Sequence, residues 1–327
     1  MTNRLVVVLL TAAFSLWAGE AVSQAVGAYP ARTVKIVVPL SPGGSADVIA
    51  RLFAQKLSEQ LKQPFVVENR PGGNMIPAAD YVAKSAPDGY TLFEANTSIL
   101  TILSSLYSKL PFDPQRDFAS VSMLVRGPTV LVVHSSVEAR SVKELIALAK
   151  AAPGRLNYGT PGSGTPFHLS TELFKTQSGT DFVHVPYKGN APAIVDLLAG
   201  RMQLMFANVL EVLPHIKSGK LRPLALTGFN RLALLSDVPT MAETGIRDAE
   251  SYSFFAFVAP RGTPREVIAT LNAEIAKAKA QPDVRQRLYE LGVEPGGDSL
   301  EEFDVFLRNE TVKWAKVVKA SGAKIDN

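Results

Sequence analysis

The sequence predicts an α/β protein made of two doubly wound lobes with a central cleft. One pattern occurs twice: an apolar strand is followed by the glycine loop 41–45 and a helix, and later a second apolar strand is followed by the glycine loop 160–165 and another helix. Each unit continues into a further strand–helix–strand unit, and these end in asparagine, at Asn96 and at Asn208. The same elements in the same order predict two related lobes.

Alternating strand and helix signals predict the elements of the first lobe. Strands are expected at 34–38, 65–68 and 90–93, because each is a short apolar run bounded by turn residues. Helices are expected at 47–61, where apolar side chains repeat with a 3.6-residue period, and at 76–86. This βαβαβ order is typical of a parallel sheet with helices on both faces.

The second lobe is expected to follow a crossing between the lobes. The β-rich stretch 121–133, interrupted at Gly127-Pro128, is the candidate hinge, and 254–259 is the candidate return crossing. The elements expected between them are helix 142–151, strand 156–159, helix 166–177, strand 183–187, helix 191–199, strand 203–206 and strand 221–226.

Two helices are expected after the return crossing. One covers 264–280, with Thr263 as its N-cap and Pro264 in its first turn. The other covers 299–319 and is expected to pack on the first lobe. The predicted organisation is a signal peptide at 1–25, a first lobe at 26–125 and 258–327, and a second lobe at 126–257.

The N-terminal segment predicts export. Arg4 precedes the apolar stretch 5–17, which is too short to span a membrane comfortably, and 23–25 or 21–23 fits a small-x-small cleavage site. A membrane anchor is the alternative interpretation. The chain has no cysteine, which excludes disulfides and a cysteine-linked lipid anchor and suits the bacterial periplasm.

Composition excludes some classes of function. With 46% hydrophobic and 20% charged residues, the chain can bury two cores and is not expected to be disordered. The net charge of +4 is mildly basic, and the basic residues are scattered, so no nucleic-acid partner is predicted. The charge suits an acidic ligand.

The two glycine loops are the main candidate binding site. They do not match a nucleotide-binding loop or a nucleophile elbow, but they provide amides and hydroxyls at helix N-termini, which bind carboxylates. Ordinary tight turns are the alternative. The candidate residues are Ser41, Pro42, Gly43, Gly44, Ser45, Thr160, Gly162, Ser163, Gly164 and Thr165.

Polar residues that follow strands extend this candidate site. They are Asn96, Thr97, Ser98, Tyr187 and Asn208, with His168 on the helix after the second loop. Helix capping by Thr97 or Ser98 and packing of the His168 ring are the alternatives. No histidine spacing fits a metal site and no nucleophile–base pair is recognisable, so we expect no catalytic residues, metal or cofactor.

Motifs along nearly the whole mature chain resemble the Bug (TctC-type) periplasmic solute-binding receptors. The residues that carry this resemblance are Tyr29-Pro30, Val38-Pro39, Pro42-Gly43-Gly44-Ser45, Asp47, Arg51, Val67-Glu68-Asn69-Arg70-Pro71-Gly72, Pro87-Asp88-Gly89-Tyr90-Thr91-Leu92, Pro186-Tyr187-Lys188-Gly189, Ala199-Gly200, Ser218-Gly219-Lys220-Leu221-Arg222 and Ala259-Pro260-Arg261-Gly262-Thr263-Pro264.

The resemblance implies a type II periplasmic binding protein with Venus-flytrap architecture. It implies a monomeric receptor that captures a small carboxylate and passes it to the membrane permease subunits of a tripartite tricarboxylate-type transporter. The binding loops would then be 41–45 and 160–165. Two alternatives stay open at this stage: a secreted two-domain enzyme acting on an anionic substrate, and the soluble ligand partner of a sensor.

Overall fold

The computed structural model describes residues 29–247, 249–297 and 299–321. The chain divides into two units, Met1–Ala31 and Arg32–Asn327, and the fold given below is that of the second unit. The expected signal peptide at 1–25 lies outside the described residues. None of the described helices is long and apolar enough to cross a membrane.

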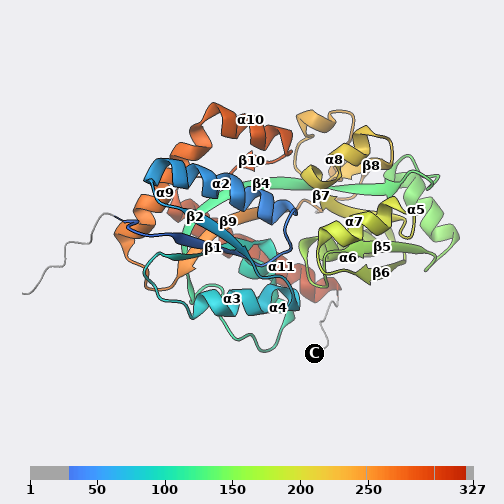
Figure 1. The fold of residues 1–327 in the computed structure, drawn as a ribbon. Coiled ribbons are helices and arrows are strands. Elements are labelled where there is room, and N and C mark those ends of the chain that lie inside the picture. Colours follow the sequence, from blue (N-terminus) through green and yellow to red (C-terminus); the bar gives the residue numbers. More distant parts are fainter. Residues whose placement is uncertain (1–28, 248, 298, 322–327) are drawn as a thin grey trace, which may run out of the picture. The chain divides into compact units, whose positions relative to one another are not determined.

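The first lobe is built on a parallel three-stranded arrangement in the order β2-β1-β3 (Figure 1). These strands are β1 (Val34–Val38), β2 (Phe65–Asn69) and β3 (Thr91–Asn96). Helix α2 (Ser45–Leu61) follows β1, and α3 (Ile76–Ala83) precedes β3. The predicted βαβαβ order is therefore present.

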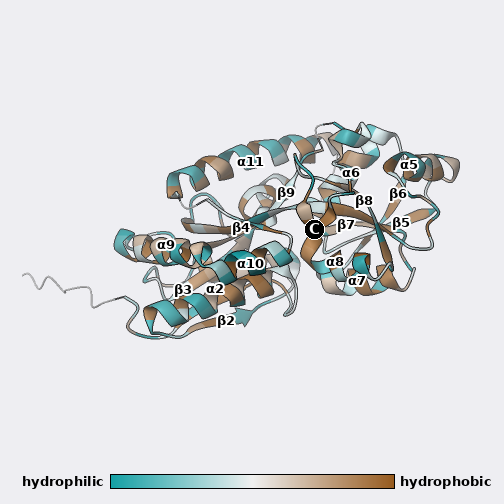
Figure 2. Cartoon of the chain, turned by 90° about the horizontal axis from the view of Figure 1, so that it is seen from above, coloured by the Kyte–Doolittle hydropathy of each residue, from teal (hydrophilic) through white to brown (hydrophobic). Residues whose placement is uncertain are grey.

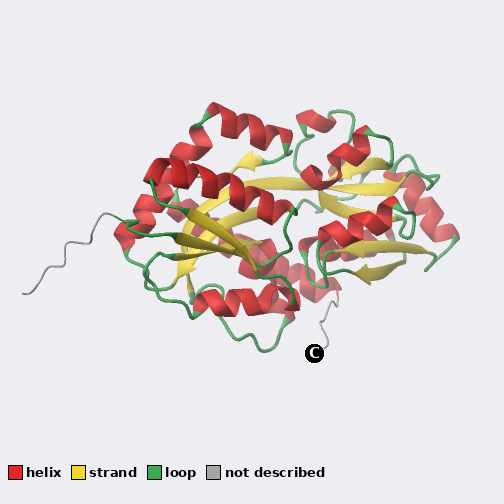
Figure 3. Cartoon of the chain, in the orientation of Figure 1, coloured by secondary structure: helices red, strands yellow, loops and turns green. Residues whose placement is uncertain are grey.

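The second lobe repeats this arrangement with strands in the order β7-β5-β6. These strands are β5 (Leu156–Thr160), β6 (Phe182–Pro186) and β7 (Leu204–Asn208). Helix α6 (Pro166–Ser178) follows β5, and α7 (Asn190–Leu198) precedes β7. Helices cover both faces of the strands in each lobe (Figure 3).

The remaining elements complete the two lobes. The strands are β4 (Phe118–His134), β8 (Leu221–Leu226), β9 (Tyr252–Pro260) and β10 (Glu294–Pro295). The helices are η1 (Gly73–Met75), η2 (Ser98–Ile102), α4 (Leu103–Leu106), α5 (Val142–Ala151), α8 (Val209–Lys217), η3 (Ala233–Leu235), η4 (Ala242–Thr244), α9 (Arg265–Ala280), α10 (Pro282–Glu290) and α11 (Leu300–Ser321).

Strand β4 connects the two lobes as one continuous strand. Its first part pairs with β9 as far as Pro128, and from Thr129 onward it pairs with β7. The expected interruption at Gly127-Pro128 was therefore wrong. Pro128, which has no N–H to donate, lies where β4 changes partners, so the missing hydrogen bond is tolerated there.

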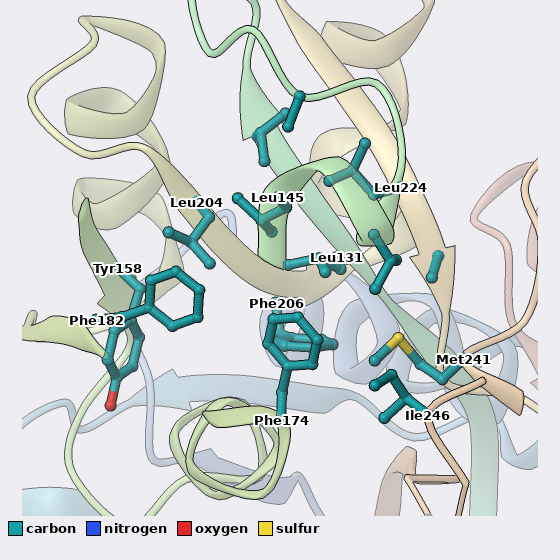
Figure 4. Packing of buried hydrophobic residues seen from close by; sticks show 14 of the residues in the cluster. Leu131, Leu145, Tyr158, Phe174, Phe182, Leu204, Phe206, Leu224, Met241 and Ile246 are labelled. Atoms are coloured by element: carbon teal, nitrogen blue, oxygen red, sulfur yellow. The ribbon is translucent and has the colours of Figure 1, made fainter. Parts of the chain in front are cut away.

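Each lobe has its own hydrophobic core. In the first lobe, Val37, Ala79 and Phe93 belong to one buried cluster formed between the strands and α3. In the second, Tyr158, Phe174, Phe182 and Phe206 pack with Leu131, Leu145, Leu204, Leu224, Met241 and Ile246 (Figure 4). These cores fix the ends of the strands from which the cleft residues extend.

Helix α11 contacts both lobes. Figure 2 shows it running along the first lobe toward α6. Its Trp314 and Val318 are buried with Ile102 and Leu106, and also with Leu169 of α6. The sequence predicted the contact of this helix with the first lobe, but not its contact with Leu169 of α6 in the second lobe.

The start of α9 differs from the prediction. The helix begins at Arg265 with Pro264 as its N-cap, and no side chain caps it. The hydroxyl of Thr263 instead donates to the carbonyl of Pro260 at 2.8 Å, which closes the preceding turn. The expected capping role of Thr263 was therefore wrong.

Candidate functional site

The two glycine loops have equivalent structures. Gly43 and Gly164 both have positive φ, at 84° and 75°, a conformation that favours glycine. The N–H of Gly43 donates to Oδ2 of Asp47 at 2.9 Å, and the N–H of Gly164 donates to Nδ1 of His168 at 3.2 Å. In each lobe, a side chain in the first helical turn thus closes the loop that precedes it.

Several backbone N–H groups of the glycine loops, which were expected to bind a ligand, donate hydrogen bonds to side chains of the protein itself. Besides Gly43 and Gly164, the N–H of Gly162 donates to Oγ1 of Thr160 at 3.3 Å. The N–H of Ser45 donates to Oε1 of Glu211 at 3.0 Å. These amides are therefore already used in hydrogen bonds that hold the loops in place. Much of the cleft lining comes from other segments.

A cleft of about 500 Å³ lies between the two lobes. Its lining comes from the first lobe, the second lobe and β9. The sequence-predicted candidates that line it are Ser41, Gly44, Ser45, Asn96, Thr97, Ser98, Thr165, Tyr187 and Asn208. The candidates outside the lining are Pro42, Gly43, Thr160, Gly162, Ser163, Gly164 and His168.

The candidates outside the lining have identifiable structural positions. Pro42 and Gly43 are exposed at the tip of the first loop, where glycine is favoured by the positive φ of residue 43. Thr160 is completely buried, and its hydroxyl contacts Nε2 of His184 at 2.7 Å. These residues shape the loops without bordering the cleft.

His168 belongs to an aromatic stack behind the second loop. Its ring lies 4.3 Å from that of His184, which in turn lies 4.8 Å from that of Tyr158. Burial lowers the pKa of His168, and burial together with His168 lowers the pKa of His184 to about 4. Neutral imidazoles therefore support the loop, as the packing alternative predicted.

Two polar side chains at the end of β3 form hydrogen bonds within the protein. Oδ1 of Asn96 accepts from the N–H of Ile99 at 3.3 Å, and Oγ1 of Thr97 accepts from the N–H of Phe254 at 3.1 Å. The capping role considered for Thr97 or Ser98 thus falls to Asn96. Ser98 borders the cleft, and its hydroxyl has no partner among the described residues.

Glu211 is the main cleft residue that the sequence did not reveal. It lies in the first turn of α8, and its Oε1 also accepts from Oγ of Ser45 at 2.6 Å. Oε2 accepts from Nδ2 of Asn190 at 2.6 Å, and Asn208 donates to Oγ of Ser45 at 2.9 Å. Side chains of the second lobe thus bond directly to the start of α2 in the first lobe.

The environment of Glu211 acts on its ionisation in opposite directions. The pKa of the Glu211 carboxyl is raised, because the effect of burial exceeds that of the hydrogen bonds from Ser45, Asn190 and Asn208, which oppose the rise. Both of the oxygens accept hydrogen bonds, one from a backbone N–H, which can only donate.

Helix N-termini surround the cleft. The lining includes Ser45 at the start of α2, Thr165 at the N-cap of α6, Asn190 at the start of α7 and Asn208 at the N-cap of α8. Helix N-termini carry partial positive charge and favour anions. Among the described lining residues, Lys188 is the only lysine or arginine and Glu211 the only acidic residue.

The structure also bears on metal chemistry. Within the described residues, no group of three or more histidine, cysteine, aspartate or glutamate side chains is placed to hold a metal ion. The polar groups that border the cleft are helix N-termini, hydroxyls, amides, the Glu211 carboxyl and the Lys188 side chain.

Two similar α/β lobes with a cleft at the ends of their parallel strands define a two-lobed solute-binding protein. The family model described as the tripartite tricarboxylate transporter family receptor matches residues 49–323. The chain belongs to this family, as its motifs predicted.

Relatives agree with this assignment. Protein BugT of Bordetella pertussis is 38% identical over 313 residues, which cover 95% of this chain and 96% of BugT. The structure of R. palustris Rpa4515 with adipate is 40% identical with a TM-score of 0.88, covering 91% of this chain and 100% of that one. MatC from Rhodopseudomonas palustris with bound malate is 30% identical with a TM-score of 0.84, covering 89% and 100%.

Proposed function

We propose that this protein is a periplasmic receptor that captures a small carboxylate between its lobes and delivers it to the membrane permease subunits of a tripartite tricarboxylate-type transporter. The observation that carries the proposal is the cleft bordered by the N-termini of four helices from both lobes. Membership of the receptor family and the carboxylates in the structures of two relatives support it.

The proposed boundary between the lobes follows the strand pairing. The expected limits were 26–125 with 258–327, and 126–257. The change of partners along β4 favours a first boundary near Pro128. Because β9 pairs with β4 from Tyr252 and with β3 from Phe255, we place the return to the first lobe just before Tyr252.

The function can be tested on protein purified without refolding. Native mass spectrometry should detect a small carboxylate bound to it, and titration calorimetry with a carboxylate panel should give saturable binding with the ligand recovered unchanged. Turnover of the compound would favour the secreted enzyme instead. Absence of binding to any carboxylate would contradict the receptor function.

Replacing Ser98 with alanine should weaken ligand binding without unfolding the protein. The Ser98 hydroxyl borders the cleft and has no partner among the described residues. Loss of one hydrogen bond to a charged group costs about 1.5–3 kcal/mol, or roughly ten- to a hundred-fold in affinity. Ser163→Ala is the matched control, because Ser163 lies outside the lining. Equal affinities for wild type and both variants would exclude Ser98 from the site.

Ligand binding should close the cleft. A small anion contacts both lobes only when they are together, so those contacts favour the closed state. We expect a smaller radius of gyration by small-angle scattering at saturating ligand, and a higher melting temperature because the ligand binds only the native state. Identical scattering curves with and without ligand would rule out closure, even if calorimetry showed binding.

A further inference from the structure

We infer that Glu211 makes the cleft selective for a carboxylate whose other end carries a hydrogen-bond donor, most favourably an ammonium group, and that it disfavours dicarboxylates. This inference rests on the proposed carboxylate-receptor function and specifies the class of ligand. It follows from three features of the cleft: the occupied start of α2, the orientation of the Asn190 amide, and the lack of a cation beside Glu211.

The start of α2 already holds a carboxylate. Glu211 accepts both the N–H and the hydroxyl of Ser45, at 3.0 and 2.6 Å. A helix N-terminus carries only about half an elementary charge, so one carboxylate offsets it. A ligand carboxylate placed here would have to compete with Glu211 for these donors, and the ionised form of Glu211 would repel it.

The neighbouring amide presents an acceptor. Nδ2 of Asn190 donates to Oε2 of Glu211 at 2.6 Å, and because a carboxylate oxygen accepts, this contact sets which way the amide points. Oδ1 of Asn190 is then buried without a hydrogen-bond partner among the described residues. Both Glu211 and Asn190 line the cleft. A ligand donor would satisfy the unpaired acceptor, whereas a second carboxylate would add only acceptors.

No cation among the described residues pairs with Glu211 to favour its ionised form. Its hydrogen-bond donors are the neutral groups of Ser45 and Asn190. No ion pair to Glu211 occurs among the described residues, and Lys188, which also borders the cleft, is exposed. A buried carboxylate is stabilised strongly by an opposite charge, which an ammonium-bearing ligand would supply.

The rest of the cleft remains suited to the ligand carboxylate. Ser98 and Thr165 lie at other helix starts around it, and no acidic side chain other than Glu211 appears among the described lining residues. The Thr165 hydroxyl already donates to the carbonyl of Gly162 at 2.8 Å, so the side-chain donor on this side is the Ser98 hydroxyl. The cleft is therefore asymmetric, with an acceptor region at Glu211 and Asn190 and a donor at Ser98.

The test uses matched pairs of probes that differ only at one end. Titration calorimetry would compare succinate with 4-aminobutyrate, glutarate with 5-aminopentanoate, and adipate with 6-aminohexanoate. For the chain length that binds, we expect wild type to favour the amino acid by at least tenfold. Glu211→Gln should reduce that ratio at least tenfold, and the exposed-site control Glu302→Gln should leave it unchanged.

The possible outcomes distinguish a failure of the selectivity assigned to Glu211 from a failure of the proposed receptor function. If wild type binds the dicarboxylate as tightly as its amino partner, the selectivity assigned to Glu211 is wrong while the receptor function stands. The wild-type ratio decides this point even if Glu211→Gln does not fold. If wild type binds no probe and carries no carboxylate by native mass spectrometry, the receptor function is contradicted, and the inference with it.

Discussion

The wild-type protein should become less stable as the pH rises from about 5 to above 8, and replacing Glu94 with glutamine should abolish this loss of stability. Glu94 lies in β3, its side chain is completely buried, and neither carboxyl oxygen has a hydrogen-bond partner among the described residues. Burial, with a further contribution from the charge of Asp47, raises its pKa from 4.5 to about 8. The native protein therefore keeps this carboxyl neutral at pH 7.

The sign of the effect follows from proton binding. Between the unfolded pKa of 4.5 and the folded pKa of about 8, the folded protein holds a proton that the unfolded chain has lost. Stability is then complete below the unfolded pKa and falls as the pH rises through this window. At about 1.4 kcal/mol per pKa unit, the total fall is about 4–5 kcal/mol.

Urea unfolding at several pH values would measure this dependence. The difference in free energy of unfolding between Glu94→Gln and wild type should increase by about 4–5 kcal/mol from low to high pH, because glutamine does not titrate. In Asp47→Asn, the free energy of unfolding should fall less with rising pH than in wild type, since this variant lacks the charge that contributes to the raised pKa of Glu94. Parallel pH profiles for wild type and Glu94→Gln would show that Glu94 does not keep its proton.

The repeated architecture could be predicted because its strands, helices and loops depend on local sequence patterns. The strands β1 and β8 and the helix α5 have the bounds that their apolar runs predict, and each glycine loop lies between its strand and helix. These signals depend on a few neighbouring residues. The continuity of β4 through Pro128 could not be predicted, because it depends on partners that lie far away in the sequence.

The same limit explains why Glu211 was missed. Asn208 followed three residues later by Glu211, just as an apolar helix begins, matches a capping box in which both side chains serve their own helix. In the structure Asn208 makes no such cap, and both side chains bond to Ser45 in the other lobe. Sequence spacing shows which groups are available, but not that a second lobe offers them a better partner.

The internal bonds of the glycine loops illustrate a further limit. The loops appeared to offer a series of free amides, yet Asp47 and His168 each accept one from four residues earlier. Asp47 also accepts hydrogen bonds from Arg51 and Asn69, so one side chain joins the loop, α2 and β2. Helical spacing alone indicates only the local Asp47–Arg51 ion pair, because these two residues lie four apart on one helix.

Replacing Trp314 with alanine should lower the free energy of unfolding by about 3–5 kcal/mol, the usual cost of removing a large buried aromatic side chain. Trp314 is 1% exposed and packs with Ile102, Leu106 and Leu169, so its loss leaves a cavity between α11 and both lobes. Denaturant unfolding would measure the change. The control is Val312→Ala, because that side chain is 57% exposed and its truncation should change stability by less than about 0.5 kcal/mol.

The position of this cavity gives the variant a second expected effect. Helix α11 packs on η2, which begins at the cleft residue Ser98, and on α6, whose N-cap Thr165 also borders the cleft. Loosening this contact should let the two helix starts move relative to each other, so Trp314→Ala should also weaken ligand binding under conditions where it remains folded. Val312→Ala should bind like wild type. A Trp314→Ala protein with wild-type stability would show that α11 is not held by this contact, whereas lower stability with unchanged affinity would confine its role to the fold.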